Sequence, residues 1–250
     1  MVPLELALGF GIGLLLGLLG GGGSILTVPA LVYLVGQTPQ AAVTTSLAIV
    51  GANSLVGALF HRAQGTMDWK VALTFGGAGM LASYLSVNIS SQWPPAVLLL
   101  IFGLLMLVIG VMLFFRRSPD SEPIYSAKPI ALVLASGAGV GLLTGVLGVG
   151  GGFLIVPALV MLVGLPVQVA VGTSLVVIAM NSAAGFLGHA GLGSFDLILT
   201  LTFAAAGLVG TFAGTKLSGR IPASRLQKTF AAFVIVVAIF LIFDNFSKIL

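Results

Sequence analysis

The chain repeats itself, and this duplication restricts the folds open to it more than any other feature. A shift of 128 residues lays positions 9–61 over 137–189 without a gap, and 30 of the 53 pairs are identical. Proline, glutamine, asparagine and histidine recur at this one offset, which chance similarity between apolar helices would not reproduce. A fixed period indicates two copies of one structural unit. We predict a first repeat at 1–115, a linker at 116–128 and a second repeat at 129–250.

Composition indicates which solvent surrounds these repeats. Hydrophobic residues make up 58% of the chain and charged residues only 6%, against about 25% charged in an ordinary soluble domain. So few charges cannot hydrate a soluble fold, but they can cover the loops of a helix bundle in lipid. Cysteine is absent, which excludes disulfides and thiolate chemistry. The basic residues are scattered and form no nucleic-acid patch. The sequence predicts an all-α integral membrane protein.

Each repeat divides into five apolar segments. They run at about 2–19, 25–36, 41–60, 69–88 and 96–115, and at about 130–147, 153–164, 169–188, 197–215 and 226–243. A full span needs roughly 17–25 residues, so the second segment of each copy is too short. It follows a glycine run and contains Pro29 or Pro157, and proline disfavours helix in the residue before it. We expect hairpins of short helices with unwound backbone at 20–28 and 148–156, near the membrane midplane, and helix resuming near each proline.

The basic residues distinguish two topologies. If the first two segments form a hairpin, each copy crosses with odd parity and the copies are inverted. If they form one broken span, the copies are parallel. The inverted arrangement puts nine of the ten lysines and arginines on one side, whereas the parallel one divides them six to four. Because cytoplasmic loops are rich in Lys and Arg, we expect inverted repeats in the cell (inner) membrane, with the linker in the cytoplasm and both termini outside.

The glycine runs predict a binding site. Unwound backbone at membrane depth survives where it lines a cavity, and broken helices at matching positions of two repeats indicate a transporter site. The amides of these runs, with the helix N-terminus that follows, could hold an anion. The competing role is close helix packing. The candidate residues are Gly20, Gly21, Gly22, Gly23 and Ser24 in the first copy and Gly148, Gly150, Gly151 and Gly152 in the second.

A polar stripe follows on the third segment of each copy. Its residues lie within an arc of about 80° at 100° per residue: Ser46, Asn53, Gly57 and His61, then Ser174, Asn181, Gly185 and His189, with Thr45 and Thr173 beside them. A buried asparagine amide suits an oxyanion, but it also suits hydrogen bonding between membrane helices. For the Thr–Ser pairs, interhelical bonding or capping competes with substrate binding.

The remaining unusual residues lie at segment ends. His61 and His189 are candidates for a gate or proton relay, with a solvated interfacial role as the alternative. Asp68 and Asp196 are expected to cap the fourth segment of each copy, because carboxylates favour helix N-termini. Neither glycine run is followed by Lys-Ser or Lys-Thr, and no HExxH motif occurs, so no phosphate loop or zinc-protease site is predicted.

The chain resembles the TauE/SafE family of sulfite exporter-like membrane proteins. The likeness rests on GLLGGGGSILTVPAL and its second copy GVLGVGGGFLIVPAL, and on the Thr-Ser-Leu motifs that each precede an Asn-Ser pair. The resemblance implies transport of a sulfur-containing anion such as sulfite, thiosulfate or an organosulfonate. Gly21 and Ser24 correspond to Val149 and Gly152, so the copies need not contact substrate equally.

We therefore expect a secondary transporter for a small sulfur-containing anion. An anion channel of the same architecture is the first alternative, and a non-transporting assembly factor or membrane enzyme is the second. The expected partners are the anion, the lipid bilayer and a coupling proton or sodium ion. We expect no catalytic residue, metal or cofactor.

Overall fold

The computed structural model describes residues 2–19, 22–63, 65–90, 94–115, 129–147, 152–189, 196–218 and 223–246, which form helices joined by short turns and contain no β-strand. The first half contains α1 (Val2–Leu19), α2 (Gly22–Pro29), the π-helical η1 (Ala30–Leu34), α3 (Pro39–Ala63), α4 (Trp69–Ser90) and α5 (Pro95–Phe115). The second contains α6 (Ile130–Leu147), α7 (Gly152–Ala158), the π-helical η2 (Leu159–Val163), α8 (Val167–His189), α9 (Leu197–Ser218) and α10 (Ala223–Phe246). The all-helical prediction is confirmed. The linker 116–128 lies outside the described residues.

The short second segments differ from the prediction. Helix begins at Gly22 and Gly152, well before the prolines, and Pro29 and Pro157 lie inside α2 and α7. The expectation that helix resumes only near Pro29 is therefore wrong for 22–28 and 152–156, while 20–21 and 148–151 are not described. The preference of a pre-proline residue is weak enough for tertiary packing to override. A wider π-helical stretch follows each proline and changes the hydrogen-bond register beside a residue that lacks an amide N–H.

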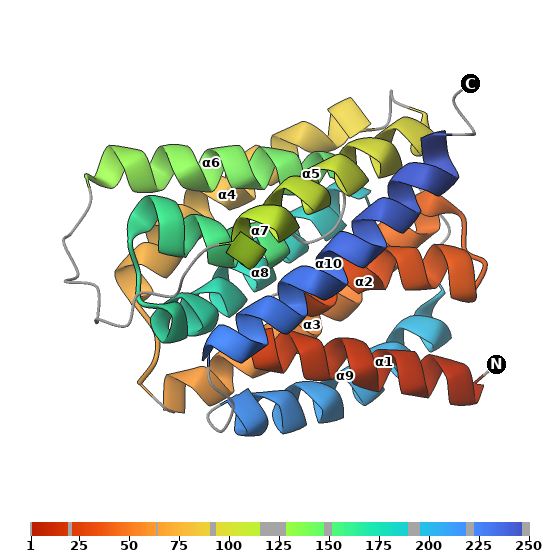
Figure 1. The fold of residues 1–250 in the computed structure, drawn as a ribbon, viewed down its shortest axis with the longest axis horizontal. Helices are drawn as coiled ribbons and strands as arrows, with labels where there is room; N and C mark the ends of the chain where they lie inside the picture. The colour runs from red at the N-terminus through yellow and green to blue at the C-terminus, as the bar shows by residue number, and fades with distance from the viewer. Residues whose placement is uncertain are drawn as a thin grey trace.

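Two pairs of corresponding helices pack antiparallel. In α3 and α8, Gly51 lies opposite Ser182, and Gly57 lies opposite Leu175. In α5 and α10, Gly103 lies opposite Leu241 and Gly110 lies opposite Val234. The α3/α8 pair forms the middle of the bundle, with α1 and α9 on one side and α4 and α6 on the other (Figure 1).

The first helix of each copy packs along a helix of the other copy. Helix α1 runs parallel to α9, and a Cβ at Gly13 would overlap the backbone of Gly207. Helix α6 runs parallel to α4 in the same way, with Gly141 against Gly79. Such glycines let helices approach closely in a membrane protein. One hydrophobic core therefore contains residues from both halves of the chain.

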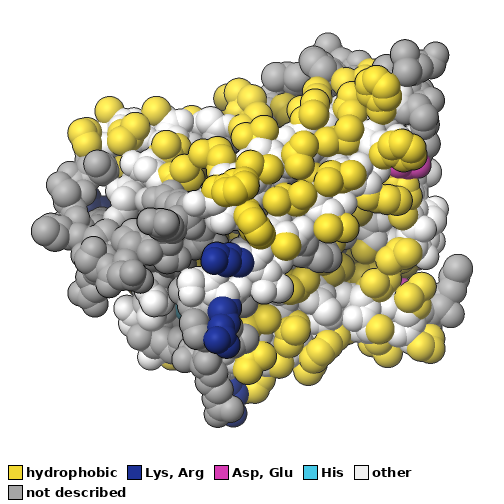
Figure 2. All heavy atoms as spheres, viewed as in Figure 1, with side chains coloured by type: hydrophobic (Ala, Val, Ile, Leu, Met, Phe, Trp, Pro, Cys, Tyr) yellow, Lys and Arg dark blue, Asp and Glu magenta, His cyan; other side chains and the backbone are white. Residues whose placement is uncertain are grey.

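Apolar side chains cover the outside of the bundle, as Figure 2 shows for one face. Among the described residues, α3, most of α8 (Gln168–Gly188) and most of α9 (Leu197–Leu217) are long and apolar enough to span a membrane, and the other apolar helices are shorter over these residues. Apolar surface of this extent indicates contact with lipid. The protein is thus an integral membrane protein.

The basic side chains gather at one end of the bundle. Because α9 runs parallel to α3, the end of α3, the start of α4, the end of α9 and the start of α10 meet at one end. That end, called the basic end below, carries every lysine and arginine that the structure describes: Arg62, Lys70, Lys216, Arg225 and Lys228, all exposed. In Figure 2 most dark-blue side chains lie left of the centre of the face, and the magenta ones lie near its right edge.

The predicted helix caps are present. The Val71 N–H donates to Asp68 Oδ1 at 2.9 Å, and the Leu199 N–H donates to Asp196 Oδ1 at 3.0 Å. Each carboxylate thus satisfies an amide that the first turn of α4 or α9 leaves without a helical partner.

Candidate functional site

Asn53 lies at the interface between α3 and α9. Its side chain is 1% exposed, and its amide occupies the space above Gly207, where any Cβ would overlap Nδ2. Gly207 in turn contacts Gly13 of α1. The glycine is therefore what allows a buried amide to fit between closely packed helices.

Asn181 has the corresponding position in the second copy. It is also 1% exposed, and a Cβ at Gly79 of α4 would lie 2.9 Å from its Oδ1 and 3.0 Å from its Nδ2. Because α3 and α8 cross antiparallel with Gly51 opposite Ser182, the two asparagines lie at about the same height in the bundle. One faces α9 and the other faces α4.

Neither asparagine amide has a hydrogen-bond partner within the described part of the chain, at nitrogen or at oxygen. The same holds for the hydroxyls of Ser54 and Ser182, which follow them in sequence. A buried polar group left without a partner costs about 1–3 kcal/mol. Asn53 and Asn181 occupy equivalent positions with the same unpaired side-chain amide, and both positions are suited to binding a polar ligand.

The Thr–Ser pairs behave differently in the two copies. Thr173 Oγ1 accepts a bond from the Asp68 N–H at 3.0 Å, and the Ser174 hydroxyl donates to the Val171 carbonyl at 2.7 Å. Thr45 and Ser46 are fully buried, and their hydroxyls find no partner among the described residues. Thr173 thus holds the start of α4 against α8, while Thr45 has no such contact.

The described part of the glycine segments is closely packed. Gly23 is buried against α1, and a Cβ there would overlap the Ile12 carbonyl oxygen. Ser24 is fully buried, and its polar contacts lie within the protein. Gly22 and Gly152 begin α2 and α7. Close packing alone accounts for Gly23. Five candidates fall outside the described residues: Gly20, Gly21, Gly148, Gly150 and Gly151.

His61 is buried, with 4% of its side chain exposed, so the expectation of a solvated interfacial histidine is wrong for this copy. Its Nδ1 lies 2.9 Å from Thr66 Oγ1, while Nε2 has no partner among the described residues. Thr66 follows Gly65, whose backbone is in the left-handed region (φ 69°) that glycine adopts readily. The turn at Gly65 brings Thr66 back against the C-terminal end of α3, where its N–H bonds the His61 carbonyl. The side chain of His189 is not described.

Sequence reasoning missed Thr211 on α9. It is fully buried, its hydroxyl is without a partner among the described residues, and a Cβ at Gly57 would lie 3.2 Å from its Cγ2. The 128-residue offset relates it to Ser83 and relates Gly207 to Gly79. This small-residue pattern on the fourth segments is the signal that could have identified it.

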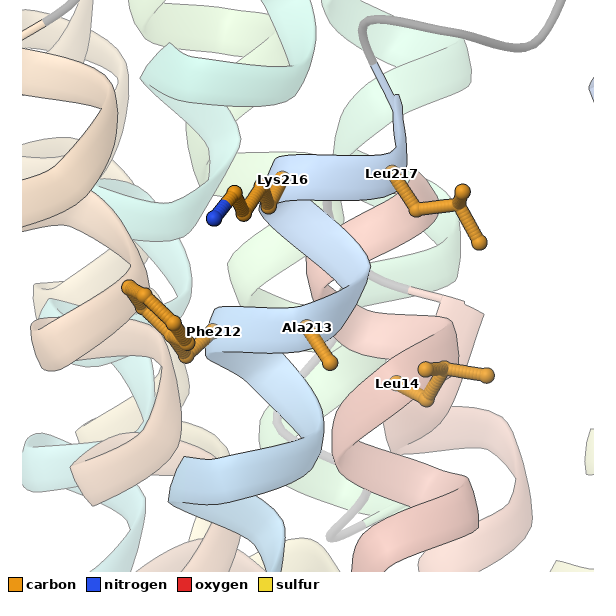
Figure 3. Close-up of a pocket in the computed structure, with 5 residues that line it drawn as sticks. All are labelled: Leu14, Phe212, Ala213, Lys216 and Leu217. Atoms are coloured by element: carbon orange, nitrogen blue, oxygen red, sulfur yellow. The ribbon is translucent and has the colours of Figure 1, made fainter.

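A separate groove of about 330 Å³ lies between α1 and α9 and does not include either asparagine. Figure 3 shows Leu14, Phe212, Ala213, Lys216 and Leu217 around it. Its lining is apolar except for Lys216. It has none of the convergent polar groups that specify a small-molecule site.

The electrostatics of the bundle interior favour neutral donors. No lysine, arginine, aspartate or glutamate of the described segments is buried, and His61 is the buried titratable residue there. No described His, Asp or Glu cluster could hold a metal ion. A ligand in the bundle interior would therefore be bound mainly by hydroxyl and amide groups.

Comparison with known proteins gives the family. The sulfite exporter TauE/SafE family profile matches residues 5–241. A probable membrane transporter protein of Xylella fastidiosa is 35% identical over 248 residues, which cover 95% of this chain and 94% of that protein. The probable membrane transporter protein YunE of Bacillus subtilis is 31% identical and covers 89% of each chain. One from Methanocaldococcus jannaschii is 26% identical over 97% of this chain and 96% of its own. No solved structure matches the chain. Because the family profile covers nearly the whole chain and the relatives align with it almost end to end, this chain belongs to the TauE/SafE family of membrane transporters.

Proposed function

We propose that this membrane transporter is a secondary carrier for a small sulfur-containing anion, and that Asn53 and Asn181 bind the anion. The main supporting observation is that both side-chain amides are buried at about the same height in the bundle. Asn53 packs over Gly207 of α9, Asn181 packs over Gly79 of α4, and neither amide has a hydrogen-bond partner among the described residues. A role in holding helices together would need an acceptor or donor across the interface, and no described residue supplies one.

The neutral interior supports an anion as the substrate. A dehydrated cation would need carboxylates or clustered carbonyl oxygens, and no described carboxylate is buried. An oxyanion accepts bonds from amide N–H and hydroxyl groups, which Asn53, Asn181 and Thr211 present. The family profile, described as a sulfite exporter, supports sulfur as the central atom.

We further propose that the two repeats are inverted in the membrane. Corresponding helices pack antiparallel in the α3/α8 and α5/α10 pairs. A twofold axis lying in the plane of the membrane would relate the two copies in this way. The basic end would then be cytoplasmic, since cytoplasmic ends carry the excess of Lys and Arg. Both termini would lie outside with Glu5 and Asp244. A C-terminal reporter that is active in the cytoplasm would contradict this topology.

The function is tested by transport in proteoliposomes loaded with sulfite, thiosulfate or sulfoacetate. A carrier should show saturation and counterflow with at least one of these anions, whereas a channel would pass current in proportion to the driving force. Asn53→Ala and Asn181→Ala should each weaken binding roughly 10- to 150-fold, because a hydrogen bond to a charged group contributes about 1.5–3 kcal/mol.

Asn245→Ala is the matched control. Asn245 is equally buried, but its Nδ2 bonds the Leu241 carbonyl at 2.9 Å and Tyr33 Oη at 3.1 Å. This variant should lose stability and keep its affinity. If Asn53→Ala and Asn181→Ala behave like the control at matched levels of folded protein, the asparagines do not bind substrate.

A further inference from the structure

One polar face of α9 lies against the polar stripe of α3. Gly207 and Thr211 are four residues apart and so share a face of α9, while Asn53, Gly57 and His61 share a face of α3. Asn53 packs over Gly207, and Thr211 packs over Gly57. These five residues, called the inner half-path below, lead from the middle of the bundle to the end of α3.

The inner half-path is buried but contains unpaired polar atoms. Asn53, His61 and Thr211 are each at least nine-tenths buried. Among the described residues, both amide atoms of Asn53, the Thr211 hydroxyl and His61 Nε2 lack a hydrogen-bond partner. Buried groups of this kind are normally satisfied by protein or by water. Three in sequence along one interface are suited to water or a polar solute passing between the helices.

The residues around the inner half-path show where it ends and which solute that end favours. Phe60 and Phe212 pack with ring centroids 5.2 Å apart beside Thr211 and His61, which places apolar bulk next to the interface. The path ends at the basic end, where Arg62 follows His61 and Lys216 follows Thr211 by little more than one turn. Exposed cations at this mouth raise the local concentration of an anion.

We propose that the anion passes between Asn53 and the basic end through the inner half-path, with the Thr211 hydroxyl donating a hydrogen bond to it on the way. This inference rests on the proposed function, since it gives the route to the same asparagine site. Gly57 is the narrowest point opposite Thr211, because an added Cβ would lie 3.2 Å from both Thr211 Cγ2 and Leu175 Cδ1 of α8, and only a glycine leaves room there for a solute when the helices separate.

The second copy repeats this arrangement around its asparagine. Ser83 of α4 corresponds to Thr211, and its Oγ would lie 3.7 Å from a Cβ at Gly185. Gly79 lies under Asn181 as Gly207 lies under Asn53. Because α8 runs antiparallel to α3, the α8/α4 interface leads from Asn181 toward the end of the bundle opposite the basic end. The two interfaces together would give access to the asparagines from both sides of the membrane.

The chain contains no cysteine, so single cysteines can report water access without background. Thr211→Cys in membrane vesicles should react with an impermeant anionic methanethiosulfonate from one side only, the side on which exposed Lys216→Cys reacts. Added sulfoacetate, a sulfonate that does not consume the reagent as sulfite and thiosulfate do, should slow the reaction. Val209→Cys is the matched control, because its side chain is 61% exposed on the outside of α9 and a thiol in lipid should not react.

Substitutions that keep or remove the hydroxyl complete the test. Thr211→Ser should transport with near-normal affinity, and Thr211→Val should lose about tenfold, equal to about 1.4 kcal/mol. A Thr211→Cys protein that transports but is as unreactive as Val209→Cys from both sides overturns the route while leaving the proposed function standing. One-sided reaction without protection by any tested anion would support the route and contradict the proposed substrate class.

Discussion

The two copies of the repeat share their packing but not the bonding of their polar stripes. In the second copy, Thr173 bonds the Asp68 amide and Ser174 bonds its own helix. In the first copy, the hydroxyls of Thr45 and Ser46 have no partner among the described residues. The asparagines are alike in both copies. Identical residues at one offset thus have different hydrogen-bond partners in the two copies.

This difference separates residues that hold the bundle from residues that are free to bind. Thr173 connects α8 to the start of α4 by accepting a hydrogen bond from the Asp68 N–H. Thr45 occupies the corresponding place without that connection. Glycines at helix crossings belong to the first class in both copies, because backbone contacts define them. Experiments that treat the copies as pairs can measure each class.

The largest effect is expected at the glycine crossings, where the copies should respond alike. A Cβ at Gly13 or Gly141 would overlap the backbone of the facing helix, which cannot move aside as a side chain can. Gly13→Ala and Gly141→Ala should each cost about 3 kcal/mol, the upper range for overpacking. Thermal unfolding in detergent measures this loss.

Gly11 and Gly139 provide matched controls in the same two helices. Neither has any heavy atom within 4 Å of an added Cβ, so Gly11→Ala and Gly139→Ala should leave stability unchanged or raise it by up to about 1 kcal/mol. Equal melting temperatures for Gly13→Ala and Gly11→Ala would show that the α1/α9 crossing is looser than described.

The next effect should differ in sign between the copies. Thr173→Val removes the acceptor of the Asp68 N–H and should destabilise the protein by about 1–2 kcal/mol, because a part-buried hydrogen bond between α8 and the start of α4 is lost. Thr45→Val removes a buried hydroxyl without a described partner and should leave stability equal or higher. Urea or thermal unfolding of both variants measures the difference. A matching loss in Thr45→Val would mean that the copies are bonded alike.

The sequence predicted the fold better than the site for a physical reason. Hydropathy and the 128-residue offset depend on many residues, so the ten segments could be located even where individual boundaries moved. The helical path of 22–29 depends on tertiary packing that overrides the weak preference of a pre-proline residue. The burial of His61 depends on the turn at Gly65 and Thr66, and Thr211 is recognised only when α9 is seen to face α3. The small-residue pattern that Gly207 and Thr211 share with Gly79 and Ser83 is visible in the sequence, but it does not say which helix those residues face.

The smallest effect concerns a contact that only the first copy has. Tyr33 of η1 donates its hydroxyl to Asp244 Oδ2 at 2.6 Å and accepts from Asn245 Nδ2 at 3.1 Å, while its ring packs edge-on against Phe240 at 5.4 Å. The corresponding residue of the second copy is Met161, which has no hydroxyl. The contact joins the first hairpin to α10 at the end opposite the basic end.

Tyr33→Phe keeps the ring contact and removes both hydrogen bonds, so its effect isolates the hydroxyl. Asp244 is partly exposed, and water can replace part of what it loses. We therefore expect a loss of about 1 kcal/mol, within the usual range for one net hydrogen bond. Met161→Leu should change stability by less than about 0.5 kcal/mol, as for a surface substitution. Thermal unfolding of the two variants compares the hairpins directly. If Tyr33→Phe is as neutral as Met161→Leu, the hydroxyl adds nothing to stability, and apolar contacts such as the one between Tyr33 and Phe240 hold the first hairpin to α10.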